Sequence, residues 1–422
     1  DCLLSRGLGD VYKRQVCIGP ANAAKSYNSP ELIVSAAMAF KADAIHPGYG
    51  FLSEKADFVK MVEDENIGFV GPSSEHIRRM GDKIEAKKIA QAAGVPTVPG
   101  SDGVVTEFGE ALDVAKQTGF PLLIKAAAGG GGRGMRVVES EDTLEKDLNE
   151  IMNEAQSAFN DSSVYIERYL TDIRHIEIQV LADGENAIAL GERDCTSQRR
   201  NQKLIEEAPS PAIDDELRAG LQEAAINLCK EVGYKNAGTV EFVFDNIERK
   251  YYFIEMNTRI QVEHPVTEMI TGVDLIQEQL RIASGQKLRL TQDDVQIRGH
   301  AIECRINAED PNENFAPRPG KIEHYRTPGG FGVRMDTHIE TGYTIPPFYD
   351  SMVGKLICWA ETRDEAIKRT LRALDELKVD GVVTTAPFQA QLINSDKFRS
   401  GEFNTGYVAK MLENMDTIPT DE

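Results

Sequence analysis

The stretch from Tyr252 to Thr271 contains oxygen ligands that could hold a metal ion. Glu255 and Asn257 follow the apolar strand residues Tyr251–Ile254 at alternate positions. Side chains two residues apart in a strand share a face, so we expect both oxygens on one side. Glu241, within the sequence Gly-Thr-Val-Glu-Phe, supplies a third oxygen. Carboxylate and amide oxygens are ligands that Mg²⁺ accepts, and the set predicts a magnesium site.

The same run also carries side chains that could bind and deprotonate an anion. Arg259, Gln261 and Glu263 continue the alternate spacing with a cation, an amide and a carboxylate. A single carboxylate at a strand end is usually only solvated. A whole row of these types, however, predicts an anion clamp and a general base beside the metal.

A glycine-rich segment is the candidate phosphate-binding element. It reads Lys125-Ala-Ala-Ala-Gly-Gly-Gly-Gly-Arg-Gly134 between two apolar strands. Glycines let backbone N–H groups approach phosphate oxygens, and Lys125 and Arg133 would neutralise their charge. No helix begins directly after it, so it is neither a Walker A loop nor a dinucleotide fingerprint. We predict a mobile glycine flap; a flexible hairpin tip is the alternative. Glu167–Leu170 could form an adenine edge.

Composition limits the classes of protein. The chain has 422 residues, 41% hydrophobic and 27% charged, which is typical of a globular protein of two or three domains. A net charge of −21 argues against a general nucleic-acid binder. No apolar run approaches the length needed to span a bilayer, so we expect no membrane segment.

The cysteines indicate a reducing, cytoplasmic environment. Six cysteines are scattered along the chain without a Cys-x-x-Cys pair or a zinc spacing. Cys195 lies close in sequence to candidate site residues, but we interpret it as a bystander thiol and not as a nucleophile.

The order of elements predicts an α/β and α+β fold. Strands and helices alternate from Val16 to Pro72, which indicates a parallel sheet covered by helices. The expected domains are residues 16–96, an N-terminal parallel α/β domain with a linker helix, residues 97–170, the small flap domain, and residues 171–422, a large domain with a mixed sheet. Residues 1–15 show no signal-peptide pattern and are interpreted as an atypical prefix.

Several segments together resemble biotin carboxylase, the ATP-grasp subunit of acetyl-CoA carboxylase. They are His46–Glu54, Met80–Lys83, Gly129–Met135, Glu192–Cys195 with Gln202-Lys203, Glu255–Thr271 and Arg298–Asn307. The resemblance runs from about Val16 almost to the C-terminus, and motifs of this length are highly specific. It implies an ATP-grasp fold and carboxylation of biotin by bicarbonate and ATP through carboxyphosphate, on a biotin carboxyl carrier protein. Carboxyltransferase subunits would then form malonyl-CoA for fatty acid synthesis.

The resemblance also implies a role for individual residues. ATP contacts fall on Lys83, Lys125, Gly131, Gly132, Glu167, Arg168, Tyr169, Leu170, His175, Gln198, Asn201, Glu241 and Glu255. Glu241, Glu255 and Asn257 would hold Mg²⁺ or Mn²⁺. Lys203, Arg259, Gln261 and the Val262 backbone would bind bicarbonate. Glu263 would be its general base, and Arg305 would face the ureido oxygen of biotin.

The sequence departs from the family in a few places. Ala127-Ala128 replaces Ser-Gly in the glycine loop, Arg168 replaces a common Lys, and Asn201 stands where some members have His. The first strand of the family and the segment after it are absent, so the N-terminal domain is expected to be incomplete. A homodimer is expected if that region is intact.

Three alternatives remain open at this point. The chain could serve a pyruvate or another acyl-CoA carboxylase; the missing Ala-Met-Lys-Met biotin-attachment signature favours a separate subunit. It could be a carbamoyl-phosphate synthase relative, which would not need Arg305, or a non-catalytic ATP-binding fragment. Arg305 could also form a purely structural ion pair with a carboxylate such as Glu303.

Overall fold

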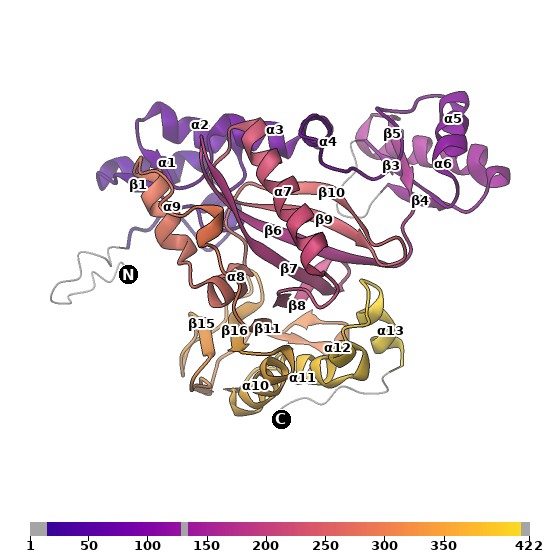
Figure 1. Ribbon diagram of the computed structural model, residues 1–422. Coiled ribbons are helices and arrows are strands. Elements are labelled where there is room, and N and C mark those ends of the chain that lie inside the picture. Colours follow the sequence, from indigo (N-terminus) through magenta and orange to yellow (C-terminus); the bar gives the residue numbers. More distant parts are fainter. Residues whose placement is uncertain (1–14, 128–133, 415–422) are drawn as a thin grey trace.

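The computed structural model describes residues 15–127 and 134–414, and one eight-stranded sheet forms its centre (Figure 1). Neighbouring strands in this sheet run antiparallel. At its edge, the only parallel pairing among the described residues is an isolated bridge between Thr97 and Phe253. The spatial order is β10 (Lys250–Asn257), β9 (Lys235–Asp245), β6 (Ile173–Asp183), β7 (Ala187–Arg199), β8 (Gln202–Ala208), β11 (His300–Asn307), β16 (Met352–Ala360) and β15 (Val333–Thr337).

The N-terminal segment forms the predicted parallel unit, although its strands are very short. Strands β1 (Ala44–Ile45) and β2 (Gly68–Phe69) pair in parallel. Phe58, Val59 and Val62 of helix α2 (Ala56–Asp64) form a small core against which Ile45 of β1 and Phe69 of β2 pack. The helices of this segment are α1 (Pro30–Ala39), α2 (Ala56–Asp64), α3 (Ser74–Gly81) and α4 (Lys83–Ala92).

The linker helix expected within residues 16–96 is α4, which is separate from α3. Helix α3 ends at Gly81, and α4 begins at Lys83. The residue between them, Asp82, has an extended backbone, and its side chain accepts hydrogen bonds from the N–H groups of Ile84 and Glu85. Asp is a favoured N-cap because it satisfies these otherwise unpaired donors, so Asp82 starts a new helix.

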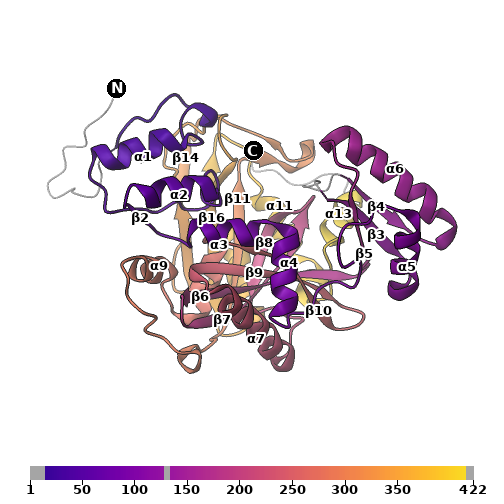
Figure 2. The same ribbon diagram turned by 90° about the horizontal axis from the view of Figure 1, so that it is seen from above.

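Residues 97–170 contain a three-stranded sheet of their own. This antiparallel sheet has the order β4 (Met135–Val138), β3 (Leu122–Ala126) and β5 (Val164–Arg168), and helices α5 (Phe108–Thr118) and α6 (Glu141–Phe159) pack against it. Figures 1 and 2 place these elements at the opposite end of the molecule from α1 and α2. Most of the predicted glycine flap, residues 128–133, lies outside the described residues.

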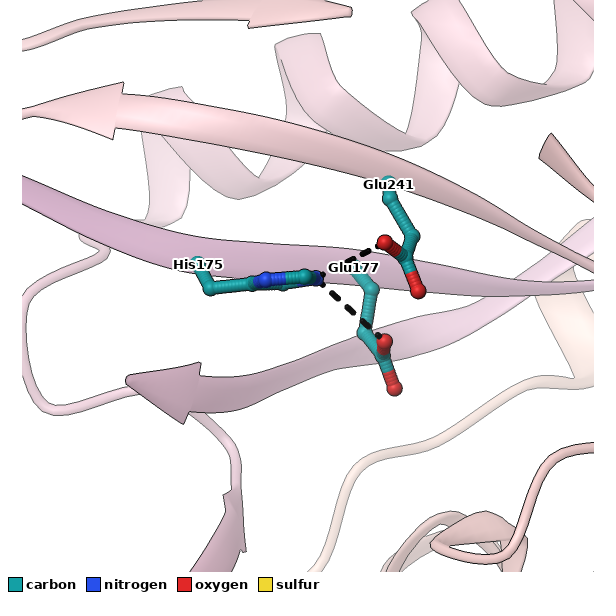
Figure 3. A group of neighbouring side chains, drawn as sticks. All are labelled: His175, Glu177 and Glu241. Atoms are coloured by element: carbon teal, nitrogen blue, oxygen red, sulfur yellow. Dashed lines mark ion pairs between the residues drawn. The ribbon is translucent and has the colours of Figure 1, made fainter. Parts of the chain in front are cut away.

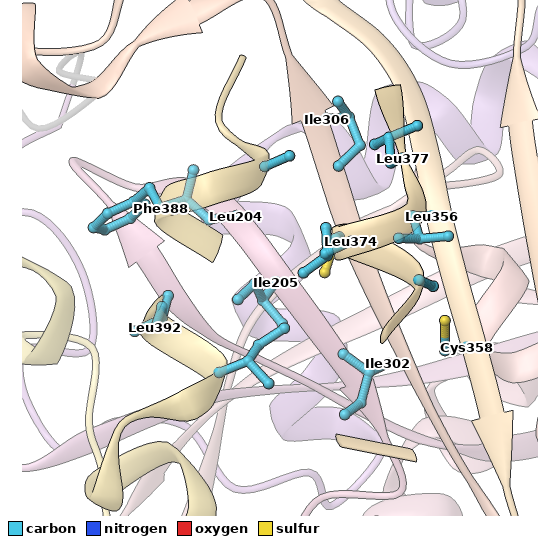
Figure 4. Close-up of a cluster of buried hydrophobic side chains, with 14 of the residues drawn as sticks. Leu204, Ile205, Ile302, Ile306, Leu356, Cys358, Leu374, Leu377, Phe388 and Leu392 are labelled. Atoms are coloured by element: carbon cyan, nitrogen blue, oxygen red, sulfur yellow. The ribbon is translucent and has the colours of Figure 1, made fainter. Parts of the chain in front are cut away.

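Helices cover both faces of the large sheet. Helices α7 (Asp215–Val232), α10 (Arg363–Glu376) and α11 (Ala386–Asn394) pack on one face, and α8 (His264–Thr271) and α9 (Leu275–Ala283) pack on the other. Figure 4 shows Leu374 of α10 and Phe388 of α11 gathered with strand residues such as Ile302. Fully burying such a side chain stabilises the fold by about 1.5–3 kcal/mol.

Several short elements connect and flank these layers. They are α12 (Asp396–Ser400), α13 (Tyr407–Glu413), β12 (Glu309–Asp310), β13 (Ala316–Pro317), β14 (His324–Arg326), β17 (Lys378–Asp380) and the 3₁₀ turns Ala23–Lys25, Gln292–Asp294 and Pro311–Glu313. A search of the described helices found none with both the length and the apolar character that crossing a membrane requires.

The polar row that follows Glu255 is not one continuous strand, and that expectation is wrong. Strand β10 ends at Asn257, residues 258–263 form a loop, and Glu263 is the N-cap residue of α8. Pro265 lies in the first turn of that helix, where its fixed φ favours helix initiation. Glu263 therefore reaches the site from a helix start and not from a strand face.

Candidate active site

A buried ammonium group lies at the centre of the candidate site. The Nζ atom of Lys203 on β8 lies 2.6 Å from Glu263 Oε1, 2.7 Å from Glu177 Oε2 and 3.3 Å from Glu241 Oε1. We refer to these four residues as the Lys203 cluster. Burial alone would lower the pKa of Lys203, but the surrounding negative groups hold it well above its usual value. Lys203 is therefore a fixed cation, as an anion site requires.

Glu263 is a buried carboxylate between two cations. Its Oε1 accepts from Lys203, and its Oε2 accepts from Arg305 NH2 at 2.9 Å. Burial favours the neutral acid, but Lys203, Arg305 and Arg193 together lower the pKa of Glu263 well below its usual value. The side chain is thus ionised at neutral pH, which a general base must be before it accepts a proton.

Among the described residues, Arg305 forms ion pairs with Glu206 and Glu263 and not with Glu303. Its Nε donates to Glu206 Oε1 at 2.6 Å, and Glu206 lies on the neighbouring strand β8. Burial raises the pKa of Glu206 to about 7 although Arg305 opposes the shift. Within the described residues, neither carboxylate oxygen of Glu303 has a hydrogen-bond partner. The guanidinium is anchored at Glu206 and also reaches Glu263.

The three predicted metal ligands come together at the pair β9–β10. Glu255 lies directly opposite Glu241, and Asn257 Nδ2 donates to Glu241 Oε1 at 2.7 Å. Burial, together with the charge of Glu241, raises the pKa of Glu255. No hydrogen bond or ion pair to the Glu255 carboxylate occurs among the residues that the structure describes. A divalent cation between two such carboxylates would relieve their repulsion, so the donor set fits Mg²⁺.

Two further groups have metal-ligand side chains within reach of one another: His175 with Glu177 and Glu241, and Cys195 with Glu177 and Glu263. Figure 3 shows the His175 ring directed at both carboxylates of the first group. Its Nε2 lies 3.0 Å from Glu241 Oε2, and the charge of Glu241 raises the pKa of His175 although burial opposes it. The Lys203 ammonium already bonds to a carboxylate of each group.

Cys195 has the surroundings of an inert thiol. It is completely buried, and its Sγ lies 3.9 Å from Glu263 Oε1. Burial and the neighbouring carboxylates raise its pKa well above the usual value. Because the thiolate is the nucleophilic form, this environment favours the bystander interpretation.

Of the predicted bicarbonate residues, Gln261 shares the acceptors Glu177 and Glu241 with Lys203, whereas Arg259 and Val262 bind other partners. Arg259 Nε donates to Glu54 Oε2 at 2.9 Å, which ties it to the N-terminal segment. Gln261 Nε2 donates to Glu241 Oε1 at 2.9 Å. The Val262 carbonyl accepts from Lys355 Nζ at 2.8 Å, so the N–H of Val262 is the backbone group suited to an anion.

The predicted nucleotide residues are more widely spread. Lys125 Nζ lies 2.5 Å from Glu167 Oε2, and Lys87 on α4 lies 3.4 Å from the other oxygen. The backbone N–H groups of Arg168 and Tyr169 already donate to the carbonyls of Pro99 and Pro121.

The remaining predicted nucleotide residues lie at element ends. Lys83 is the first residue of α4, where its charge acts on Glu255, and Gln198 lies on β7 opposite Lys203. Asn201 occupies the exposed tip of the β7–β8 hairpin, and among the described residues its side chain has no hydrogen-bond partner. Gly131 and Gly132 lie outside the described residues.

Several residues that support the site were not predicted from the sequence. These are Glu54, Glu177, Arg193 and Glu206, each of which contacts a predicted site residue. A signal for Glu177 was present in the sequence, because His175, Glu177 and Gln179 alternate with apolar residues along one strand and so share a face. Arg193 was part of a motif that carries the family resemblance, but no role was assigned to it.

Three family models match the chain. Residues 10–77 match the biotin carboxylase N-terminal domain, residues 82–291 match the carbamoyl-phosphate synthase L chain ATP-binding domain, and residues 303–410 match the biotin carboxylase C-terminal domain. The ATP-binding model alone would leave the carbamoyl-phosphate synthase alternative open. The matches on either side of it favour biotin carboxylase.

Individual relatives agree with this assignment. Biotin carboxylase 1 of Bacillus subtilis is 54% identical over 95% of this chain and 89% of its own length. One of the pyruvate carboxylase subunits of Methanothermobacter thermautotrophicus is 50% identical over 99% of this chain and 84% of its own length. The biotin carboxylase domain dimer of the Hydrogenobacter thermophilus 2-oxoglutarate carboxylase, solved with MgADP, ADP and bicarbonate, has a TM-score of 0.85. It is 46% identical and covers 96% of this chain and 89% of that chain. The chain therefore belongs to the biotin carboxylase family of ATP-dependent, ATP-grasp carboxylases.

Proposed function

We propose that this chain carboxylates biotin on a biotin carboxyl carrier protein, as the first half-reaction of an acetyl-CoA carboxylase. The observation that carries the proposal is the position of Glu263. It is a buried, ionised carboxylate held between Lys203 and Arg305. A base between two fixed cations suits a reaction in which an anion must lose a proton and then attack another anion.

In the first step, bicarbonate becomes a nucleophile. Lys203, Arg259, Gln261 and the N–H of Val262 bind it, and Glu263 accepts its proton. A bicarbonate oxygen then attacks the γ-phosphorus of ATP, the bond to ADP breaks, and carboxyphosphate forms. Positioning and charge neutralisation account for most of the catalysis in such a transfer.

In this proposal ATP and its metal ion bind to residues next to the bicarbonate site. Glu241, Glu255 and Asn257 would hold Mg²⁺, or Mn²⁺, which neutralises phosphate charge when bound. Lys83, Lys125, the Glu167–Leu170 edge, His175 and Gln198 would contact the nucleotide, and Asn201 is the weakest member of this set. The backbone pairing of Arg168 and Tyr169 leaves groups such as the Leu170 N–H for the base.

In the second step, carboxyphosphate separates into CO₂ and phosphate. The phosphate accepts the proton from the N1 atom of biotin, and N1 then attacks CO₂ to form carboxybiotin. Negative charge develops on the ureido oxygen, and Arg305 would stabilise it. Loss of one such donor typically lowers the rate by about 10²–10³-fold.

Domain roles and partners follow from the same proposal. The N-terminal domain would be residues 16–96, the flap domain residues 97–170 and the catalytic domain residues 171–422. The chain would form a homodimer that works with the carrier and carboxyltransferase subunits. The Hydrogenobacter domain is a dimer, which supports the proposed homodimer. A pyruvate carboxylase is the second candidate, because the Methanothermobacter relative belongs to one.

Phosphate release from Mg-ATP tests the proposal. We expect release to depend on bicarbonate and to increase when free biotin is added. A rate of phosphate release that is the same with and without bicarbonate and biotin would contradict the proposal. Addition of carrier and carboxyltransferase subunits with either acetyl-CoA or pyruvate then distinguishes the two downstream acceptors.

A further inference from the structure

A completely buried arginine lies directly behind the Lys203 cluster. Arg193 on β7 has no exposed surface, and all five of its N–H groups have an acceptor. Nε donates to Glu177, NH1 donates to Gln179 at 2.7 Å and Thr267 at 3.0 Å, and NH2 donates to Thr239 at 3.1 Å and to Gln261 Oε1. These acceptors come from β6, β9, α8 and the loop before α8.

The chemistry of arginine fixes the orientation of the Gln261 amide. A guanidinium has donors and no acceptor, so only the carbonyl end of an amide can face it. The NH₂ end of Gln261 must then point away from Arg193. There it lies 2.9 Å from Glu241 Oε1 and 3.3 Å from Glu177 Oε2, on the side of Lys203. A flipped amide would bring N–H groups against N–H groups and would turn an oxygen toward any bound anion.

The same guanidinium orients Glu177. One carboxylate oxygen of Glu177 accepts from Arg193 Nε, and the other lies 2.7 Å from Lys203 Nζ. Arg193 thus connects two groups that define the donor side of the site. Lysine could not replace it, because an ammonium has three donors and no planar fork.

We propose that Arg193 is a positioning residue that presents the Gln261 NH₂ group and the Lys203 ammonium to bicarbonate. The inference rests on the proposed function, in which Gln261 and Lys203 bind that anion. A purely structural role, as one more buried ion pair, is the alternative that the experiment must separate.

The chain offers a matched control for that alternative. Arg174 on β6 is also buried, and its NH1 donates to Asp194 Oδ2 at 2.9 Å. No contact to the Lys203 cluster is found for it among the described residues. Arg174→Lys should lower the melting temperature and leave the KM for bicarbonate unchanged.

The test is a double-mutant cycle on bicarbonate-dependent ATP hydrolysis. A hydrogen bond to a charged group contributes about 1.5–3 kcal/mol, so Arg193→Lys should raise the KM for bicarbonate by about 10–100-fold. The KM for ATP should change less than about twofold, which corresponds to well under 1 kcal/mol. Gln261→Ala should also raise the KM for bicarbonate. In its background, Arg193→Lys should have a much smaller effect, because the two residues act together.

The outcomes separate the inference from the proposed function. An unchanged KM for bicarbonate in Gln261→Ala would contradict the assignment of Gln261. A raised KM in Gln261→Ala with an unchanged KM in Arg193→Lys, or additive effects in the double variant, would overturn the role of Arg193. If Arg193→Lys does not fold, Thr239→Val serves instead, since it removes one acceptor from NH2. A selective, smaller rise in the KM for bicarbonate supports the inference, and an unchanged KM overturns it.

Discussion

Two consecutive residues of strand β8, Glu206 and Glu207, enter two different buried clusters on opposite faces of the large sheet. Glu206 pairs with Arg305 on the face that carries the Lys203 cluster. Glu207 accepts from His300 Nε2 at 2.7 Å and from Arg363 Nε at 2.6 Å on the other face, and we call these three residues the Glu207 cluster. Alternation along a strand separates them.

The clusters differ in how charge is balanced. In the Glu207 cluster one carboxylate is saturated by donors, and Arg363 with His300 lowers the pKa of Glu207 to about 2 against the effect of burial. In the Lys203 cluster three carboxylates converge on one ammonium. Nearby Glu255 and Glu206 have raised pKa values. Buried charge alone therefore does not identify a site, whereas convergent and imperfectly neutralised charge does.

The largest expected effect separates the clusters by activity. Glu263→Gln should lower bicarbonate-dependent ATP hydrolysis by about 10²–10⁴-fold, because a general base is lost. Because Glu263→Gln also removes a charge that Lys203 and Arg305 stabilise, its activity is compared per folded molecule. Glu207→Gln, the matched control, should keep its activity per folded molecule; hydrolysis by Glu263→Gln at the wild-type rate would remove this residue from the mechanism.

The second prediction separates the clusters by stability. Removing the charge of Glu207 leaves Arg363 buried without its counter-ion, and breaking such a pair typically costs about 3–5 kcal/mol. Denaturant unfolding of Glu207→Gln measures this loss. A free energy of unfolding equal to that of the wild type would mean that the cluster on this face is not structural.

Glu255 should behave in the opposite way to Glu207. Glu255→Gln should raise the Mg²⁺ concentration needed for half-maximal activity by about 10–100-fold, a range seen even for the outer-shell partners of metals. It also removes repulsion from Glu241, so without metal its melting temperature should equal or exceed that of the wild type. A lower melting temperature would indicate a stabilising contact in place of a metal ligand.

The pH dependence of stability should differ in sign between neighbouring residues. The pKa of Glu207 falls from 4.5 to about 2 on folding, so its contribution is present above about pH 4.5 and is lost as the pH falls toward 2. The pKa of Glu206 rises from 4.5 to about 7, so its ionisation lowers stability as the pH rises through that interval. Comparing Glu207→Gln and Glu206→Gln with the wild type across both ranges measures each contribution. The same sign for both would contradict the comparison.

The smallest effect is expected at the hairpin tip. Asn201 has a left-handed backbone, which Asn tolerates, and its side chain is exposed. Because the side chain is exposed and unpaired among the described residues, Asn201→His should change the KM for ATP by no more than about threefold. This corresponds to a difference in binding free energy of under about 1 kcal/mol. A larger change would give position 201 a direct role in nucleotide binding.

The sequence could predict local features of the fold and many of the site residues. The apolar strands expected on either side of the glycine-rich segment are β3 and β4, and the proposed metal ligands Glu255 and Asn257 are two residues apart in one strand. Contacts that depend on long-range register could not be predicted in this way. Glu206 meets Arg305 only because β8 pairs with β11 across about a hundred residues of chain.

Other features were hidden for a similar reason. The end of β10 at Asn257 moved Glu263 from a strand to a helix start, although the side chain still arrives at Lys203. Arg193 has its role through five partners from four parts of the chain, and no local pattern contains that information.

The transfer of oxygen from bicarbonate to phosphate tests the central claim most directly. If the Lys203 cluster activates bicarbonate to attack ATP, phosphate released from unlabelled ATP and ¹⁸O-labelled bicarbonate must carry one bicarbonate oxygen. We predict this transfer in the wild type and its loss in Glu263→Gln. Phosphate from the wild type that contains only oxygens from ATP and water would contradict the account.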